Sequence, residues 1–153
     1  MKLTLAQKLD MPPVWLIACL GLAYAQSAYW PFAGFAGALW QLAAGVLVGG
    51  GVILMGLAFI EFNRAKTTVV PHQEPEALIT SGIFKRSRNP IYLADILLLA
   101  GFSFYWGAWL GVILLPVLGL ILTRRFIEPE EARLRAAFGG QFDAWALRTR
   151  RWL

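Results

Sequence analysis

The sequence predicts an all-α membrane protein, a bundle of about four transmembrane helices followed by short C-terminal helices. Of its 153 residues, 58% are hydrophobic and only 15% are charged, and the mean hydropathy is +0.59. A soluble domain has about a quarter of its residues charged. The apolar residues gather in four runs, and all 14 Lys and Arg lie outside these runs. Composition and patterning together favour a single membrane-integral domain over residues 1–153.

The first two runs cover residues 13–30 and 37–62. The first follows two lysines and contains Ala23-Tyr24-Ala25, which resembles a signal-peptide cleavage site. We interpret this run as a retained first transmembrane helix. The second run is long enough to cross a bilayer at 1.5 Å per residue. Residues 1–62 are therefore expected to form the first two transmembrane helices.

The third and fourth runs cover residues 91–105 and 107–123. The third is short, and we expect Pro90 to serve as its first helical residue, a position that proline favours. The turn around Trp106-Gly107 predicts a tight helical hairpin. Residues 63–153 thus comprise a long loop, this hairpin and the C-terminal helices.

The positive charges predict the orientation. They lie in the N-terminal tail, in the loop of residues 63–89 and in the C-terminal segment, whereas the connections near residues 31–34 and 106–107 carry none. The positive-inside rule then places both termini and the long loop in the cytoplasm, and we expect the inner membrane of a bacterium. The net charge of +5 fits contact with anionic lipid headgroups, and nucleic-acid binding is not expected.

The C-terminal segment predicts two short helices. Glu128-Pro129-Glu130-Glu131 is typical of a helix start, because proline is favoured at the first position and acids suit the positive end of the helix dipole. Gly139-Gly140 is expected to end that helix. The next helix has Phe142 and Trp145 on one side and arginines beyond it, a pattern that resembles an interfacial amphipathic segment.

Most catalytic motifs are missing from the sequence. It has no glycine-rich phosphate loop, no Cys or His cluster for a metal, and no nucleophile elbow. The single histidine, His72, is either a solvent-exposed loop residue or a contact to a substrate or cofactor. What remains is Arg88-Asn89-Pro90-x-Tyr92 before the hairpin and Glu130-Glu131 after it. If the hairpin crosses the membrane and returns, these two stretches meet at one face; alternatively they are snorkelling and capping residues.

From about Thr67 onward the chain resembles the isoprenylcysteine carboxyl methyltransferase family and its phospholipid methyltransferase relatives. Four segments carry the resemblance: Thr67-Thr68-Val69-x-Pro71, Leu78-x-Thr80-x-Gly82-x-Phe84, Arg88-Asn89-Pro90-x-Tyr92, and Glu130-Glu131-x-x-Leu134-x-x-x-Phe138-Gly139-x-x-Phe142-x-x-Trp145. It implies a membrane enzyme whose S-adenosylmethionine lies in a cytoplasmic pocket between the hairpin and the C-terminal helices.

The resemblance also implies roles for individual residues. The cofactor candidates are Gly82, Phe84, Arg88, Asn89, Tyr92, Glu130 and Glu131. The residues expected to orient the reacting groups are Arg88, Arg124 and Arg125, and the candidate substrate contacts are Pro71, His72 and Asp95. No metal is expected. Asp95 is open to two interpretations, an interface residue or a pocket residue, because carboxylates inside a membrane usually face the bundle interior.

The expected reaction is methyl transfer to a lipophilic or lipidated acceptor that arrives from the membrane. The leading acceptor is the carboxylate of an isoprenylcysteine-like compound, and the alternative is a phospholipid amine. Asn89 stands where carboxyl methyltransferases of eukaryotes usually have histidine, a departure that concerns the acceptor more than the cofactor. An NADPH-dependent sterol reductase and a non-catalytic membrane scaffold remain as alternatives of other classes. The sequence leaves the oligomeric state open.

Overall fold

The structure is a computed structural model that describes residues 10–31, 35–67 and 76–153. Helices account for most of these ranges, and no β-strand occurs within them. In chain order they are α2 (Pro12–Tyr29), α3 (Ala38–Arg64), the 3₁₀ turn η1 (Gly82–Lys85), α4 (Pro90–Trp106), α5 (Trp109–Leu122), the π turn η2 (Thr123–Ile127), α6 (Glu128–Phe138) and α7 (Gly140–Arg148). The expected all-α architecture is confirmed.

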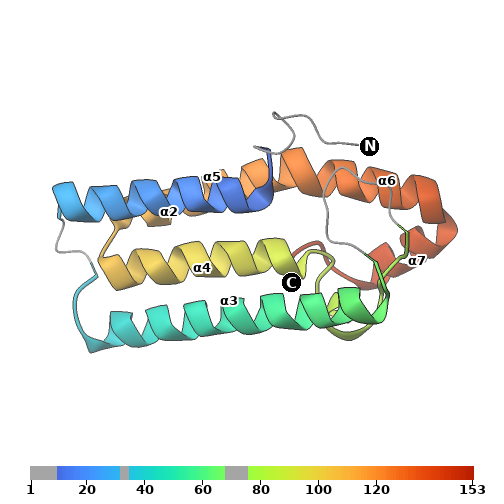
Figure 1. Cartoon of the computed structure of the whole chain (residues 1–153), viewed down its shortest axis with the longest axis horizontal. Coiled ribbons are helices and arrows are strands. Elements are labelled where there is room, and N and C mark those ends of the chain that lie inside the picture. Colours follow the sequence, from blue (N-terminus) through green and yellow to red (C-terminus); the bar gives the residue numbers. More distant parts are fainter. Residues whose placement is uncertain (1–9, 32–34, 68–75) are drawn as a thin grey trace.

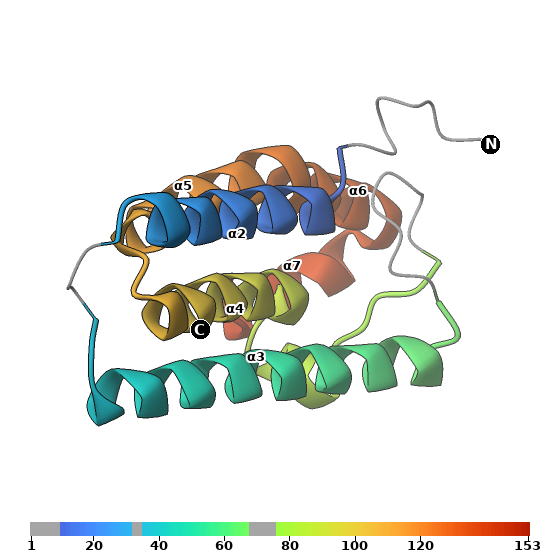
Figure 2. The ribbon, with the colours of Figure 1, turned by 60° about the vertical axis from the view of Figure 1, so that its left-hand side comes forward.

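The four long helices lie side by side, and α4 occupies the middle of the bundle (Figures 1 and 2). Helices α2 and α5 pack on α4 and on each other, whereas α3 packs against α4 and η1. The starts of α4 and α6, together with α7, lie at one end of the bundle (Figure 1). The turn between α4 and α5 lies at the opposite end. The topology therefore returns the chain after the hairpin to the end where the hairpin began.

Within the part of the chain that the structure describes, two helices are long and apolar enough to cross a membrane. These are Ala38–Arg64, with a mean hydropathy of 2.3, and the continuous helix Trp109–Phe138, with 2.0. Pro90–Trp106 is apolar but shorter. Many large apolar side chains of α2, α3 and α5 are exposed, as expected for surfaces in contact with lipid. The count of four transmembrane helices stays a prediction.

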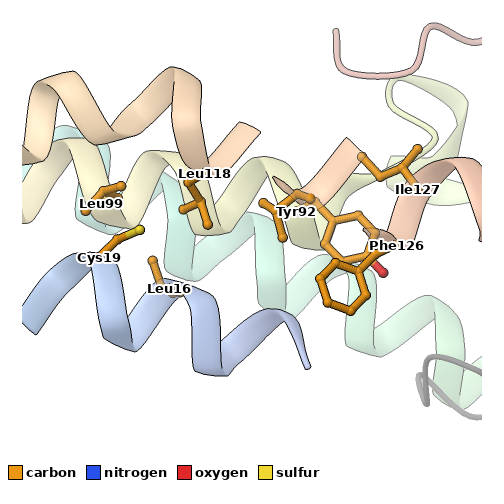
Figure 3. Close-up of a cluster of buried hydrophobic side chains, with 8 residues drawn as sticks. Leu16, Cys19, Tyr92, Leu99, Leu118, Phe126 and Ile127 are labelled. Carbon is orange, nitrogen blue, oxygen red and sulfur yellow. The ribbon is translucent and has the colours of Figure 1, made fainter. Parts of the chain in front are cut away.

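The core between α2, α4 and α5 is built from side chains that interdigitate along the bundle (Figure 3). Leu16 and Cys19 come from α2, Leu99 from α4 and Leu118 from α5. Toward the polar end, Tyr92 of α4 faces Phe126 of η2, with ring centroids 6.4 Å apart. This packing fixes the register of α4 against η2 and so positions the residues around Tyr92.

The hairpin is confirmed. Pro90 is at the start of α4, and Asn89 before it lies outside the helical region, with φ −132° and ψ 58°. Proline removes an N–H that has no helical partner at this position and keeps the preceding residue out of the helical region. At the other end Gly107 adopts a left-handed conformation, φ +68°, which terminates α4 two residues before α5 begins.

Helix α6 begins at Glu128, with Pro129 and three glutamates in its first turn as expected, but no break separates it from the helix before it. Helices α5 and α6 form one continuous helix, and the backbone of Ile127 before α6 is helical. Pro129 cannot donate to the carbonyl four residues earlier, and its ring would clash there. The π turn η2, directly before Pro129, widens the helix by one residue at this position and accommodates the proline without a break.

Candidate functional site

The two polar stretches meet at one end of the bundle. The Arg88 guanidinium pairs with the Glu131 carboxylate at 3.0 Å. Tyr92 donates its hydroxyl proton to Glu130 Oε2 at 3.0 Å. Arg151, near the chain end, pairs with the same Glu131 at 2.7 Å. Below, the polar cluster means these five residues, Arg88, Tyr92, Glu130, Glu131 and Arg151. The spatial prediction made from the hairpin is confirmed.

Arg88 uses most of its donors within the protein. Its Nε and Nη2 donate to Glu131 Oε1 at 3.1 and 3.0 Å. Its Nη1 donates to the carbonyls of Ala146, 3.0 Å, and Thr149, 2.6 Å, at the C-terminal end of α7. Carbonyls at a helix end carry partial negative charge, so a cation is favoured there. Arg88 therefore joins α6, α7 and the start of α4, and its geometry suits a positioning residue.

The segment of residues 149–153, called the C-terminal segment below, is bonded to the chain just before α4. The N–H of Arg88 donates to the Arg150 carbonyl at 2.9 Å, next to a short parallel bridge between Ser87 and Arg150. Asn89 Nδ2 donates to the Arg151 carbonyl at 3.0 Å. Asn89 is thus buried in a structural contact. A cofactor contact by Asn89, as predicted from the sequence, would use its side-chain carbonyl oxygen, Oδ1.

Glu131 is shared between two guanidinium groups. Its side chain is 12% exposed, and Arg151 donates to it through Nε and Nη2. Hydrogen bonding to Glu131 raises the pKa of the Arg151 guanidinium above its ordinary value. The pair is therefore ionised throughout the physiological range, and the carboxylate is held in one orientation.

The Tyr92–Glu130 pair has fewer partners than the Arg88–Glu131 pair. Glu130 lies in the first turn of α6, and the ring of its partner Tyr92, in α4, packs on Phe126. The positive charge of Arg133, one turn further along α6, interacts electrostatically with both the Tyr92 phenol and the Glu130 carboxylate. Arg133 is not among the site residues predicted from the sequence. Its position three residues after Glu130 in a helix could have indicated it, because such residues share a helix face.

Gly82 and Phe84 have local structural partners. Gly82 has φ +54°, and a Cβ there would lie 2.5 Å from the carboxyl group of Glu61. Glu61 is buried in α3 and accepts hydrogen bonds from Ser81 and Arg64. The Phe84 ring lies in a second apolar cluster with Phe142 and Trp145, and the Trp145 indole donates to the Phe84 carbonyl. These contacts hold η1 against α3 and α7.

The same cluster changes the interpretation of α7. Its side with Phe142 and Trp145 is buried against η1 and α3, so it packs on the protein, and the expected interfacial role of that side is wrong. Arg151, expected to contact headgroups, is bonded to Glu131. The α7 helix thus closes the end of the bundle over the loop before α4.

The other two arginines lie in separate contacts. Arg125 pairs with Asp10 at 3.0 Å and stacks over the Trp15 ring. Arg124 pairs with Glu128 at 3.5 Å and lines a groove of about 580 Å³ along α4 and α5, whose other walls are mainly apolar. The ion-pair partners of both arginines thus lie outside the polar cluster.

The remaining candidates differ in what the structure shows. Asp95 is buried in α4, one turn after Tyr92. Pro71 and His72 lie outside the described residues. Among the residues that are described, no group of three or more His, Cys, Asp or Glu side chains could hold a metal ion.

A comparison with protein-family models gives one match. The model described as phospholipid methyltransferase covers residues 39–141, about two thirds of the chain, from α3 to the start of α7. The matched region contains Arg88, Tyr92 and both glutamates of the polar cluster. No curated protein and no solved structure matches the chain.

Proposed function

The chain belongs to the phospholipid methyltransferase family, and we propose that it transfers a methyl group from S-adenosylmethionine to a lipid acceptor at the end of the bundle that carries the polar cluster. The family match carries this proposal, because it covers α3, the hairpin and α6 together. The exposed apolar surfaces of α2, α3 and α5 support a lipid acceptor that arrives from the side.

The residues around Tyr92 fit the chemistry of the cofactor. S-adenosylmethionine carries a positive sulfonium and ammonium group, one carboxylate and ribose hydroxyls. The site offers the Glu130 carboxylate, the Tyr92 hydroxyl and the positive charge of Arg133. Carboxylates suit the cationic groups and the hydroxyls, and the guanidinium suits the carboxylate. We assign the direct contacts to Tyr92, Glu130 and Arg133.

The other candidates hold this site in place. Arg88 and Glu131 bring α6 and α7 together with the start of α4. Asn89 fixes the C-terminal segment, and Gly82 and Phe84 fix η1. When bound, the cofactor supplies an activated methyl group, so the protein has to align the acceptor and exclude water, and needs no metal.

For the acceptor we favour a phospholipid amine over an isoprenylcysteine-type carboxylate. The family model that matches the chain is described as phospholipid methyltransferase. Two carboxylates, Glu130 and Asp95, lie near Tyr92. They attract a cationic headgroup and repel an anionic one. The carboxylate acceptor stays the second candidate, because the motif series from Thr67 to Trp145 resembles that of the carboxyl methyltransferases.

The proposal is tested with the purified full chain in detergent and in vesicles. Calorimetry should detect binding of S-adenosylhomocysteine, and labelled methyl groups should pass from S-adenosylmethionine to phosphatidylethanolamine in preference to an isoprenyl thioether acid. Glu130→Gln should weaken binding at least about tenfold. Glu128→Gln, two residues away in a half-exposed pair with Arg124, is the matched control and should bind like the parent. Absence of binding by the parent at millimolar concentration would favour the scaffold alternative.

A further inference from the structure

Asp95 is a buried carboxylate with an unsatisfied oxygen. The residue is 3% exposed, and its Oδ2 has no hydrogen-bond partner within the described part of the chain. It is the only charged residue of α4. A buried charge without a partner costs several kcal/mol, so natural proteins rarely keep one without a use.

The position of Asp95 relates it to the polar cluster. It follows Tyr92 by three residues, which places it about 4.5 Å further along the helix axis toward the apolar middle of the bundle. The charge of Asp95 acts on the Tyr92 phenol, as that of Glu130 does. Its helical neighbours on the same side, Tyr92 and Leu99, belong to the apolar core. Asp95 therefore lies on the apolar side of the cluster, where a lipid acceptor would enter.

A purely structural role does not explain this side chain. Buried structural carboxylates in the same protein are hydrogen-bonded: Glu61 accepts from Ser81 and Arg64, and Glu131 accepts from two arginines. Asp95 Oδ2 has no such donor.

We propose that Asp95 binds the ammonium group of the acceptor lipid and takes its proton before methyl transfer, an inference that rests on the proposed function. An ammonium group has no lone pair and cannot attack a methyl carbon. In the first step an N–H bond breaks and an O–H bond forms on Asp95. The free amine then forms an N–C bond, while the electrons of the breaking C–S bond pass to sulfur. Asp95 releases its proton to water when the product leaves, so one proton is produced per methyl group transferred.

The test compares Asp95→Asn with the parent in three measurements. Asparagine has the same shape without the charge, so the thermal midpoint should stay the same or rise. Binding of S-adenosylhomocysteine should be unchanged. With phosphatidylethanolamine as acceptor, kcat should fall at least about 100-fold and KM should rise, because both the base and the ionic contact are lost. Asp95→Glu should restore part of the activity.

Asp143→Asn is the matched control, because this aspartate is exposed at the far side of α7 and pairs with Arg135. It should behave like the parent. A lower thermal midpoint for Asp95→Asn, or amine methylation within about threefold of the parent, would overturn the proposal. Weaker binding of S-adenosylmethionine with unchanged binding of S-adenosylhomocysteine would indicate that Asp95 contacts the sulfonium group of the cofactor. That result would also overturn the proposal. If the parent itself neither binds nor transfers, the proposed function fails instead.

Discussion

Arg88 and Glu131 are 43 residues apart in sequence, and their side chains form an ion pair of 3.0 Å at the end of the bundle. The pair is mostly buried, with 14% and 12% of the two side chains exposed. It holds the start of α4 against α6, while the same guanidinium binds two carbonyls at the end of α7. The start of α4 and the two C-terminal helices, α6 and α7, are thus held together by one side chain.

Arg88→Ala should destabilise the protein strongly. The substitution leaves Glu131 with one guanidinium partner, and the carbonyls of Ala146 and Thr149 lose their hydrogen bonds from Arg88. Removal of one member of a buried ion pair costs about 3–5 kcal/mol. Arg88→Lys should rescue little, because an ammonium group cannot reproduce the planar set of donors. The thermal midpoint in detergent measures the loss. Arg135→Ala, which breaks an exposed pair, is the control and should cost less than about 1 kcal/mol.

Arg151→Ala should lower the thermal midpoint by a few degrees. Its guanidinium makes two hydrogen bonds to Glu131, and the substitution leaves that carboxylate to Arg88 alone. Arg150→Ala is the neighbouring control, because the Arg150 side chain is exposed and its hydrogen bond goes to the carbonyl of Leu153. Equal thermal midpoints for the two alanine variants would contradict the shared role of Glu131.

The hairpin and its ends were predictable because local chemistry determines them. Pro90 is favoured at a helix start, and Gly107 supplies the left-handed residue that ends the helix. The return of the chain to the same end then follows from helix length, and it predicts the meeting of Arg88 and Glu131.

Two features depended on contacts that no local pattern reveals. Pro129 does not break the helix, because the π turn before it accommodates the ring. The donors of Arg88 are directed to carbonyls of α7 and the C-terminal segment, which follow from tertiary packing and not from the residues near Arg88. The sequence therefore located the polar cluster but not the backbone contacts of Arg88, and direct cofactor contacts of Arg88, Asn89 and Glu131 stay predictions.

Gly82→Ala should destabilise more than Gly139→Ala. Both glycines have positive φ, +54° and +49°, so an alanine is strained at each position. Only at Gly82 would the new methyl group collide with another side chain, that of Glu61. The difference between the two thermal midpoints isolates the collision. Equal losses would show that Glu61 moves away without cost.

The side of the membrane on which each loop lies can be measured with single cysteines in a Cys19→Ala background. Lys85→Cys and Ala137→Cys replace exposed residues at the end with the polar cluster, and Ala28→Cys replaces one at the end of α2 at the opposite end (Figure 1). A membrane-impermeant maleimide should label the first two from one side and the third from the other. Labelling of Lys85→Cys and Ala137→Cys from opposite sides would refute the hairpin as a transmembrane unit.

Tyr92→Phe should weaken binding of S-adenosylhomocysteine by less than Glu130→Gln does. The phenyl ring keeps its packing against Phe126, so the register of α4 against η2 is retained. The Glu130 carboxylate loses its hydrogen bond from the hydroxyl, which costs about 1–3 kcal/mol when the acceptor is buried, but it keeps its charge. Calorimetry gives both affinities, and the thermal midpoints separate a binding effect from unfolding. If Tyr92→Phe binds as tightly as the parent while Glu130→Gln does not, Tyr92 only orients the carboxylate and makes no contact of its own.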